Sequence, residues 1–184
     1  PGGDAKQPVS GRAFSLGTDT LRAGSRRRYL HGLHSWALWI RSKAVTNADP
    51  SEPVEVTTTE VVVDGVRSLV RESAPDGRDR DREAVVFVHG NPGSSEDWSD
   101  LLPQAGQFTR AIAPDMPGYG KADRPKDFDY TVPGYGRHFA KLLKQLAVEK
   151  VHLVLHDFGG SWGLDFASNH PDQILSFTFF NSGV

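Results

Sequence analysis

The sequence predicts an α/β fold: a mostly parallel sheet with flanking helices and an N-terminal antiparallel hairpin. Residues 84–88, 110–114 and 151–155 form short, continuous apolar runs, which are typical of strands buried on both faces. Helix-length segments separate these runs, so strand and helix alternate, and a hairpin signal precedes them. Because ligands bind beyond the C-terminal ends of such strands, the residues that follow each run are candidate site residues.

An antiparallel hairpin is predicted at the start of this region. Residues 54–63 alternate and are rich in Val and Thr, which favours a strand. Asp64 and Gly65 then form a strong turn signal, and residues 66–71 supply the return strand.

Two loops follow the first two buried strands. Residues 89–93 contain Gly and Pro and form a turn, after which Ser94 and Asp97 fit a helix capping box. The second loop, residues 115–120, is rich in glycine and starts with an acid. Both loops lie where a site is expected.

A helix is predicted after the second loop. Thr131 is a preferred N-cap residue, and Pro133 suits the first turn. The apolar side chains have i, i+3, i+4, i+7 spacing and are Phe139, Leu142, Leu143 and Leu146.

The strand at residues 151–155 leads into the most informative stretch. Asp157 and Phe158 follow it, then two glycines and a helix-length segment at residues 161–167. Strand, tight turn and helix form a nucleophile elbow, with Asp157 in the position usually held by Ser. The glycines are expected to let the helix start close to the strand. A last strand is predicted at residues 174–180.

Composition limits the function. The 184 residues contain no cysteine, which excludes disulfides and Cys-ligated metals. The net charge of −2 gives the whole chain no nucleic-acid footprint, and no apolar run approaches the roughly 20 residues of a membrane span. Nothing in the sequence indicates a metal or an organic cofactor.

The N-terminal part differs in charge from the rest. Residues 1–45 hold eight Lys/Arg and two Asp, whereas the remainder is acidic. We therefore predict a basic, disordered or loosely helical extension at residues 1–47 and an α/β domain at residues 48–184. Residues 25–30 faintly resemble a twin-arginine export signal, so export is an alternative to the cytoplasmic location that we expect.

Three motifs together resemble the α/β-hydrolase fold family. They are VVFVHGNPGSSEDW, DMPGYG and VLHDFGG, in that order. More narrowly, the chain is similar to the branch with an Asp nucleophile, the haloalkane dehalogenases and epoxide hydrolases, over residues 54–184. The resemblance implies that Asp157 is the nucleophile and that the backbone N–H groups of Asn91 and Phe158 form an oxyanion hole. It also implies a cis bond before Pro92.

The resemblance also implies a reaction. An Asp carboxylate displaces a leaving group from a saturated carbon, and water then cleaves the resulting ester. The expected partners are a small apolar organic substrate and water. Asn91, Phe158 and Trp98 are the candidate substrate contacts, with a place in the core as the default alternative for Phe158 and Trp98.

Two residues, Phe158 and Asn91, give opposite indications of whether the substrate is an epoxide or a haloalkane. Relatives that release halide usually have Trp after the nucleophile, and Phe158 has no such donor. Asn91, after His-Gly, is the dehalogenase-like residue. We favour epoxides and keep haloalkanes as the alternative.

The family order places an acid and then a histidine after the nucleophile. Here the only later histidine is His170, at the far end of the same helix and roughly 20 Å from Asp157. In some relatives the acid ends the sixth strand, where this chain has Asn181. We therefore expect a fragment that ends before the cap domain and is active only with the missing part. The alternative is a catalytically inactive binding module whose last strand forms a pairing surface.

The other polar residues near the motifs have structural interpretations. His89 is expected to be a hydrogen-bonding residue and not a base, because buried polar groups need partners. Asp115 is expected to cap the loop that follows it. His156, at the end of its strand, is expected to be packed.

Overall fold

The computed structural model describes residues 54–75 and 77–183. The predicted extension at residues 1–47, its boundary and the arginine-rich residues 25–30 lie outside these residues. The description therefore concerns the α/β domain alone.

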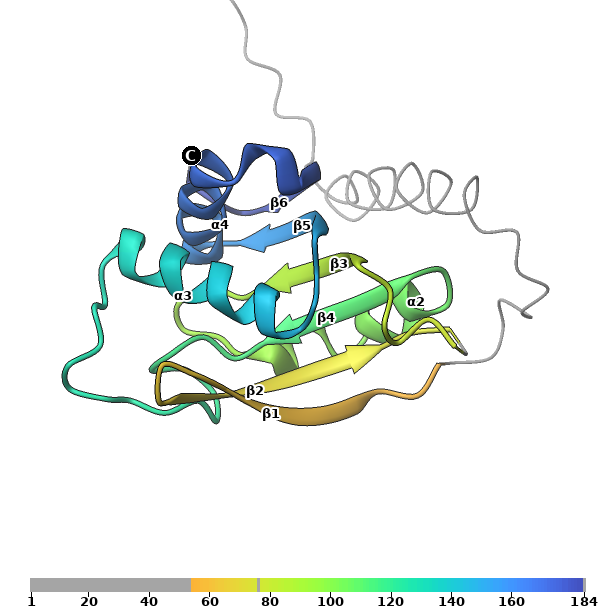
Figure 1. The fold of residues 1–184 in the computed structure, drawn as a ribbon, viewed down its shortest axis with the longest axis horizontal. Coiled ribbons are helices and arrows are strands. Elements are labelled where there is room, and N and C mark those ends of the chain that lie inside the picture. The colour runs from red at the N-terminus through yellow and green to blue at the C-terminus, as the bar shows by residue number, and fades with distance from the viewer. Residues whose placement is uncertain (1–53, 76, 184) are drawn as a thin grey trace, which may run out of the picture. The chain divides into compact units, whose positions relative to one another are not determined.

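The domain is built on a mixed six-stranded sheet (Figure 1). Across the sheet the strands are β1 (Thr57–Val63), β2 (Val66–Ser73), β4 (Arg110–Pro114), β3 (Glu83–Val88), β5 (Lys150–His156) and β6 (Ile174–Phe180). Strands β4, β3, β5 and β6 are parallel, whereas β1 and β2 are antiparallel to their neighbours. The predicted fold class is confirmed.

The hairpin turn is also confirmed. Asp64 and Gly65 have φ angles of 51° and 81°, as the tightest hairpin turns require, and Val63 pairs with Val66. The return strand β2 extends beyond the predicted end because its last residues pair with β4, where Ser73 lies opposite Ala111.

The helical elements are η1 (Ser95–Trp98), α2 (Leu102–Gly106), α3 (Val132–Gln145), α4 (Phe158–Asn169) and η2 (Pro171–Gln173). The capping box of Ser94 and Asp97 is present, but the helix that it starts is a single 3₁₀ turn. The Oγ1 atom of Thr131 accepts the backbone N–H of Gly134, so the predicted N-cap of α3 is confirmed.

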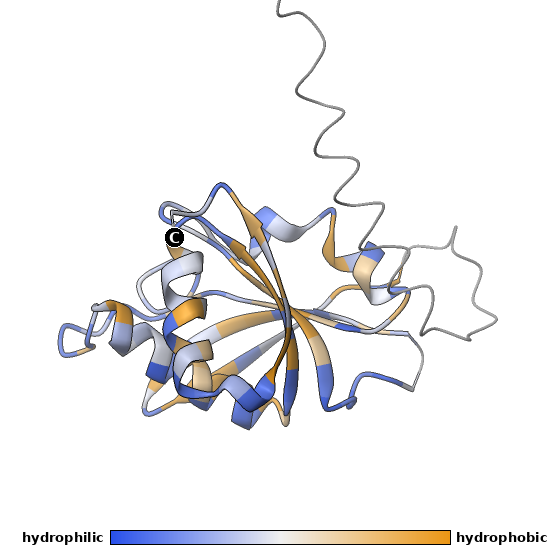
Figure 2. Ribbon diagram, turned by 90° about the horizontal axis from the view of Figure 1, so that it is seen from above, coloured by the Kyte–Doolittle hydropathy of each residue, from blue (hydrophilic) through white to orange (hydrophobic). Residues whose placement is uncertain are grey.

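The main core lies between the sheet and helices α3 and α4. Phe139, Leu142 and Leu143 of the predicted apolar stripe are fully buried, and Phe139 meets the ring of Phe166 on α4 edge to face. Figure 2 shows hydrophobic residues along the strands in the middle of the domain. This packing fixes α4 against the strand that precedes it.

Strand β6 lies at one edge of the sheet, and its two faces differ. Leu175, Phe177 and Phe179 each expose about two fifths of their surface, and the last two rings stack with centroids 5.7 Å apart. The residues between them are half-buried. Within the described residues, no helix is long and apolar enough to cross a membrane.

Candidate active site

The loops after β3, β4 and β5 meet at the C-terminal edge of the sheet. The imidazole Nε2 of His89, after β3, accepts the backbone N–H of Met116, after β4, at 3.0 Å. The backbone N–H of Asn91, also after β3, donates to Oδ1 of Asp157, after β5, at 2.9 Å. The structure thus brings together the residues that follow the three predicted strands.

Asp157 occupies a strained turn between β5 and α4. Its φ and ψ angles are 50° and −123°, a conformation that non-glycine residues rarely adopt and that costs on the order of 1–3 kcal/mol. Helix α4 begins at Phe158, three residues before the predicted start at Ser161. Asp157 lies at the N-cap position, but its side chain makes no capping hydrogen bond. The carboxylate is therefore available at the tip of the turn.

Two glycines allow the close approach of the strands and loops around Asp157. A Cβ atom on Gly159 would lie 2.5 Å from the carbonyl oxygens of Val88 and His89, so only glycine lets α4 start against β3. A Cβ atom on Gly90 would lie 2.4 Å from the Cβ of Asp157. The predicted close packing of the helix start is present at Gly159, but the strand that it meets is β3 and not the preceding strand β5.

The Asp157 carboxylate is stabilised in its charged form. The backbone N–H groups of Asn91 and then Phe158 lower the pKa of Asp157 below its ordinary value. The predicted cis bond between Asn91 and Pro92 is present. Backbone donors from the loop after β3 and from the first residue of α4 thus act on one carboxylate.

The side chains beside these donors are open to solvent. Phe158 is half exposed, and its ring lies 6.4 Å from that of Trp162. Asn91 is exposed. Phe158, directly after Asp157, therefore presents an aromatic surface without a side-chain hydrogen-bond donor.

His89 holds two loops together and is fully buried. Because the Met116 N–H is a donor, Nε2 must carry a lone pair, and the proton is on Nδ1, which donates to the Gly90 carbonyl at 2.9 Å. Burial lowers the pKa of His89, which favours this neutral form. Both ring nitrogens are occupied, so the imidazole is a structural link.

Asp115 was predicted only to cap the loop that follows it, but in the structure it also bonds to a second loop. Its Oδ2 accepts the Lys121 N–H at 2.8 Å within the following loop, as expected. Its Oδ1 accepts the Ser95 N–H at 2.7 Å, at the start of η1. The second bond joins residues 20 positions apart, and local sequence carries no signal for it.

Trp98 packs at the C-terminal ends of β3, β5 and β6 and is only 5% exposed. Its ring contacts those of Phe87, His156 and Phe180, with centroids 5.2–6.3 Å apart. Its indole N–H has no hydrogen-bond partner in the described part of the chain. His156 is half-buried against this ring.

The later residues considered as acid or base lie elsewhere. His170 follows the end of α4, and its ring stacks on Phe166. The twelve residues of α4 span about 18 Å, which separates His170 from Asp157. Asn181 follows β6 in a left-handed conformation with a φ angle of 45°. Residues 54–75 and 77–183 contain no group of three or more acidic or His side chains that could hold a metal ion.

Comparison with known proteins assigns the chain to a family. Residues 83–183 match the model of the alpha/beta hydrolase fold family. A haloalkane dehalogenase of Mesorhizobium japonicum is 31% identical over 137 residues, which are 73% of this chain and 42% of that protein.

Solved structures agree with this match. The structure of a haloalkane dehalogenase from Agrobacterium tumefaciens C58 matches with a TM-score of 0.61 at 30% identity, over 69% of this chain and 41% of that one. An epoxide hydrolase from Vigna radiata matches with a TM-score of 0.61 at 28% identity, over 68% and 39%. The chain thus spans less than half the length of these relatives.

Proposed function

Because the chain belongs to the α/β-hydrolase fold family, we propose that it carries the nucleophilic half of an ester-forming hydrolase, with Asp157 as the nucleophile. The observation that carries the proposal is the 2.9 Å hydrogen bond from the Asn91 N–H to Oδ1 of a carboxylate at the tip of the elbow. The lowered pKa of Asp157 supports an ionised, nucleophilic carboxylate at neutral pH.

The first step forms an ester. One carboxylate oxygen of Asp157 attacks a saturated carbon of the substrate and forms a C–O bond to it. In an epoxide, the bond from that carbon to the ring oxygen breaks, and this oxygen takes up a proton from water or an acid. In a haloalkane, the carbon–halogen bond breaks and halide leaves.

The second step releases the product. Water attacks the carboxyl carbon of the ester, negative charge develops on the carbonyl oxygen, and the bond to the alkyl oxygen then breaks. The backbone N–H groups of Asn91 and Phe158 would stabilise this charge. Oδ1 already accepts the Asn91 N–H in the free protein, which supports a preorganised oxyanion hole.

The attacking water must give a proton to a base. Both nitrogens of His89 are engaged, and His170 is at the other end of α4. We therefore place the base outside the described residues. On this proposal residues 54–75 and 77–183 form the ester but supply no base for its hydrolysis, so the ester accumulates unless another part of the protein supplies one.

Epoxides are the proposed substrate class. Phe158 offers no side-chain donor for a departing halide, whereas the oxygen of an opened epoxide stays attached to the product. Haloalkanes are the second candidate, because Asn91 presents an exposed amide beside Asp157 and the relative from Mesorhizobium japonicum is a haloalkane dehalogenase.

The test compares the two substrate classes on the same protein. The chain is incubated with styrene oxide or with 1-bromohexane, and the rate of covalent labelling is followed by intact mass, with bromide release measured in parallel. Faster labelling by the epoxide supports the first candidate. Faster labelling by the bromoalkane, with one bromide released per label, would favour haloalkanes as the substrate class. No labelling by either would overturn the nucleophile proposal and favour a binding module.

A further inference from the structure

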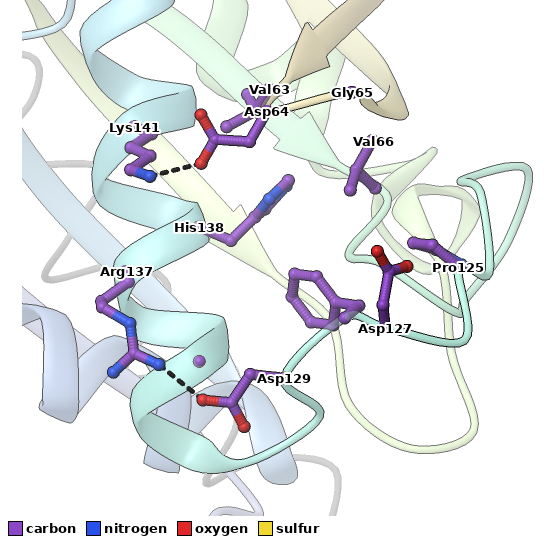
Figure 3. A pocket seen from close by; sticks show the side chains of 12 residues that line it. Val63, Asp64, Gly65, Val66, Pro125, Asp127, Asp129, Arg137, His138 and Lys141 are labelled. Carbon is purple, nitrogen blue, oxygen red and sulfur yellow. Dashed lines mark hydrogen bonds and ion pairs between the residues drawn. The ribbon is translucent and has the colours of Figure 1, made fainter.

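A pocket of about 460 Å³ lies between the β1–β2 turn, the segment before α3 and α3 itself (Figure 3). Its volume is within the range of roughly 300–1,000 Å³ that is typical of small-molecule sites. Its lining includes no residue of the elbow or of the loop after β3. The pocket is therefore distinct from the candidate active site.

His138 of α3 is a buried polar group in this lining, with 5% of its surface exposed. Its Nε2 lies 3.4 Å from Oγ of Ser68, and Nδ1 has no hydrogen bond to any of the described residues. Figure 3 shows the ring directed from the helix toward the hairpin, between two ion pairs. Burial lowers the pKa of His138 to about 4, so the imidazole is neutral at pH 7 and one of its nitrogens can accept a hydrogen bond.

The charges of the lining do not balance. Lys141 is paired with Asp64, and Arg137 with Asp129, as the dashed lines of Figure 3 show. Asp127 also lines the pocket but makes no ion pair or hydrogen bond with the described residues. With three carboxylates against two cations, the pocket carries one uncompensated negative charge.

The remaining walls are apolar or aromatic. They consist of Val63, Val66, Pro125 and Phe128. The ring of Phe128 meets the His138 ring edge to face, with centroids 5.6 Å apart. Phe128 lines the same pocket as Asp127, and an aromatic ring attracts positive charge to its face through its quadrupole.

From these contacts we propose that the pocket binds a small organic ammonium compound. The ammonium group lies at Asp127 and donates to Nδ1 of His138, while Nε2–H of His138 donates to Ser68. The organic part contacts Val66 and Phe128. This site does not depend on the reaction proposed for Asp157.

The test uses phenethylammonium chloride and the full chain, with amide shifts recorded in a titration. The expected dissociation constant is millimolar, with shifts confined to residues 63–66, 125–129 and 134–141. Phenylacetate, which has the same ring and the opposite charge, is expected not to bind. Equal binding of the two compounds, or shifts elsewhere, would overturn the proposal.

Two variants and a control assign the contacts. Asp127→Asn is expected to weaken binding about fivefold, as loss of an exposed charge pair does, and His138→Gln is expected to weaken it further. Asp100→Asn is the matched control, because that exposed aspartate lies outside the pocket lining. Unchanged affinity in Asp127→Asn, whose exposed side chain can change without loss of the fold, would contradict the proposal. Labelling of Asp157 is expected to be the same in all these variants.

Discussion

Oδ1 of Asp157 accepts the backbone N–H of Asn91 across the ends of β5 and β3 at 2.9 Å. This bond orients the carboxylate before any substrate binds. In the proposed ester intermediate, Oδ1 would be the carbonyl oxygen. The Asn91 N–H that would stabilise it there is already bonded to it in the free protein. The geometry therefore serves both steps of the proposed reaction with one orientation of the side chain.

Gly90 is predicted to be essential for that orientation. In Gly90→Ala the new Cβ would lie 2.4 Å from the Cβ of Asp157 and 2.8 Å from Oδ1, so the Asp157 side chain must move. We expect the rate of covalent labelling to fall by at least about tenfold, the effect of a displacement of about 1 Å or less. The rate is measured by intact mass, and circular dichroism checks the fold.

Gly183→Ala is the matched control for this variant. A Cβ there would meet no atom within 4 Å, so its labelling rate is expected to equal that of the wild type. Equal rates in both variants would show that Gly90 does not determine the position of Asp157.

His138 is predicted to make the fold sensitive to acid. Burial lowers its pKa from 6.5 to about 4, so the unfolded chain binds a proton over a pH range in which the folded chain does not. The free energy of unfolding should therefore fall as the pH drops from 6.5 to 4, by up to about 3 kcal/mol at 1.36 kcal/mol per pH unit.

Urea unfolding at several pH values measures this dependence. In His138→Gln the slope between pH 6.5 and 4 should become smaller by the contribution of His138, while the contribution of His89, whose pKa burial also lowers, remains. An identical pH dependence in both proteins would contradict the prediction.

A buried ion pair joins β2 to β4. Arg110 binds both carboxylate oxygens of Glu72, at 2.7 and 3.2 Å, and the two side chains are 6% and 15% exposed. Glu72→Gln would leave the Arg110 charge buried without its partner, and we expect a loss of about 3–5 kcal/mol in the free energy of unfolding. Urea denaturation measures this loss.

Glu60→Gln provides the comparison. Glu60 also pairs with an arginine, Arg67, but both side chains are exposed, so the expected loss is below about 1 kcal/mol. If the two variants lost equal stability, burial would not be the reason for the importance of the Glu72 pair.

Local signals account for the parts of the fold that the sequence predicted well. The predicted bounds of β4 and β6 agree with the structure, because each strand is a short apolar run with clear ends. The Asp64–Gly65 turn and the Thr131 cap depend on a few adjacent residues. These features need no knowledge of the tertiary structure.

Features that depend on distant contacts could not be predicted in the same way. The bond from Ser95 to Asp115 and that from Met116 to His89 join separate loops. Helix α4 begins at Phe158 and not at the predicted Ser161, because the two glycines expected in the turn belong to its first turn, where Gly159 packs on the end of β3. The predicted role of Asp157 rested on the elbow pattern together with the motifs at residues 85–98 and 115–120, and its bond to Asn91 required the structure.

The most direct test of the nucleophile proposal is to locate the covalent label by tandem mass spectrometry after reaction of the chain with styrene oxide. The account predicts one label per chain, as an ester on the peptide that contains Asp157, and no label in Asp157→Asn. A label on another residue, or an equal label in Asp157→Asn, would contradict the central claim.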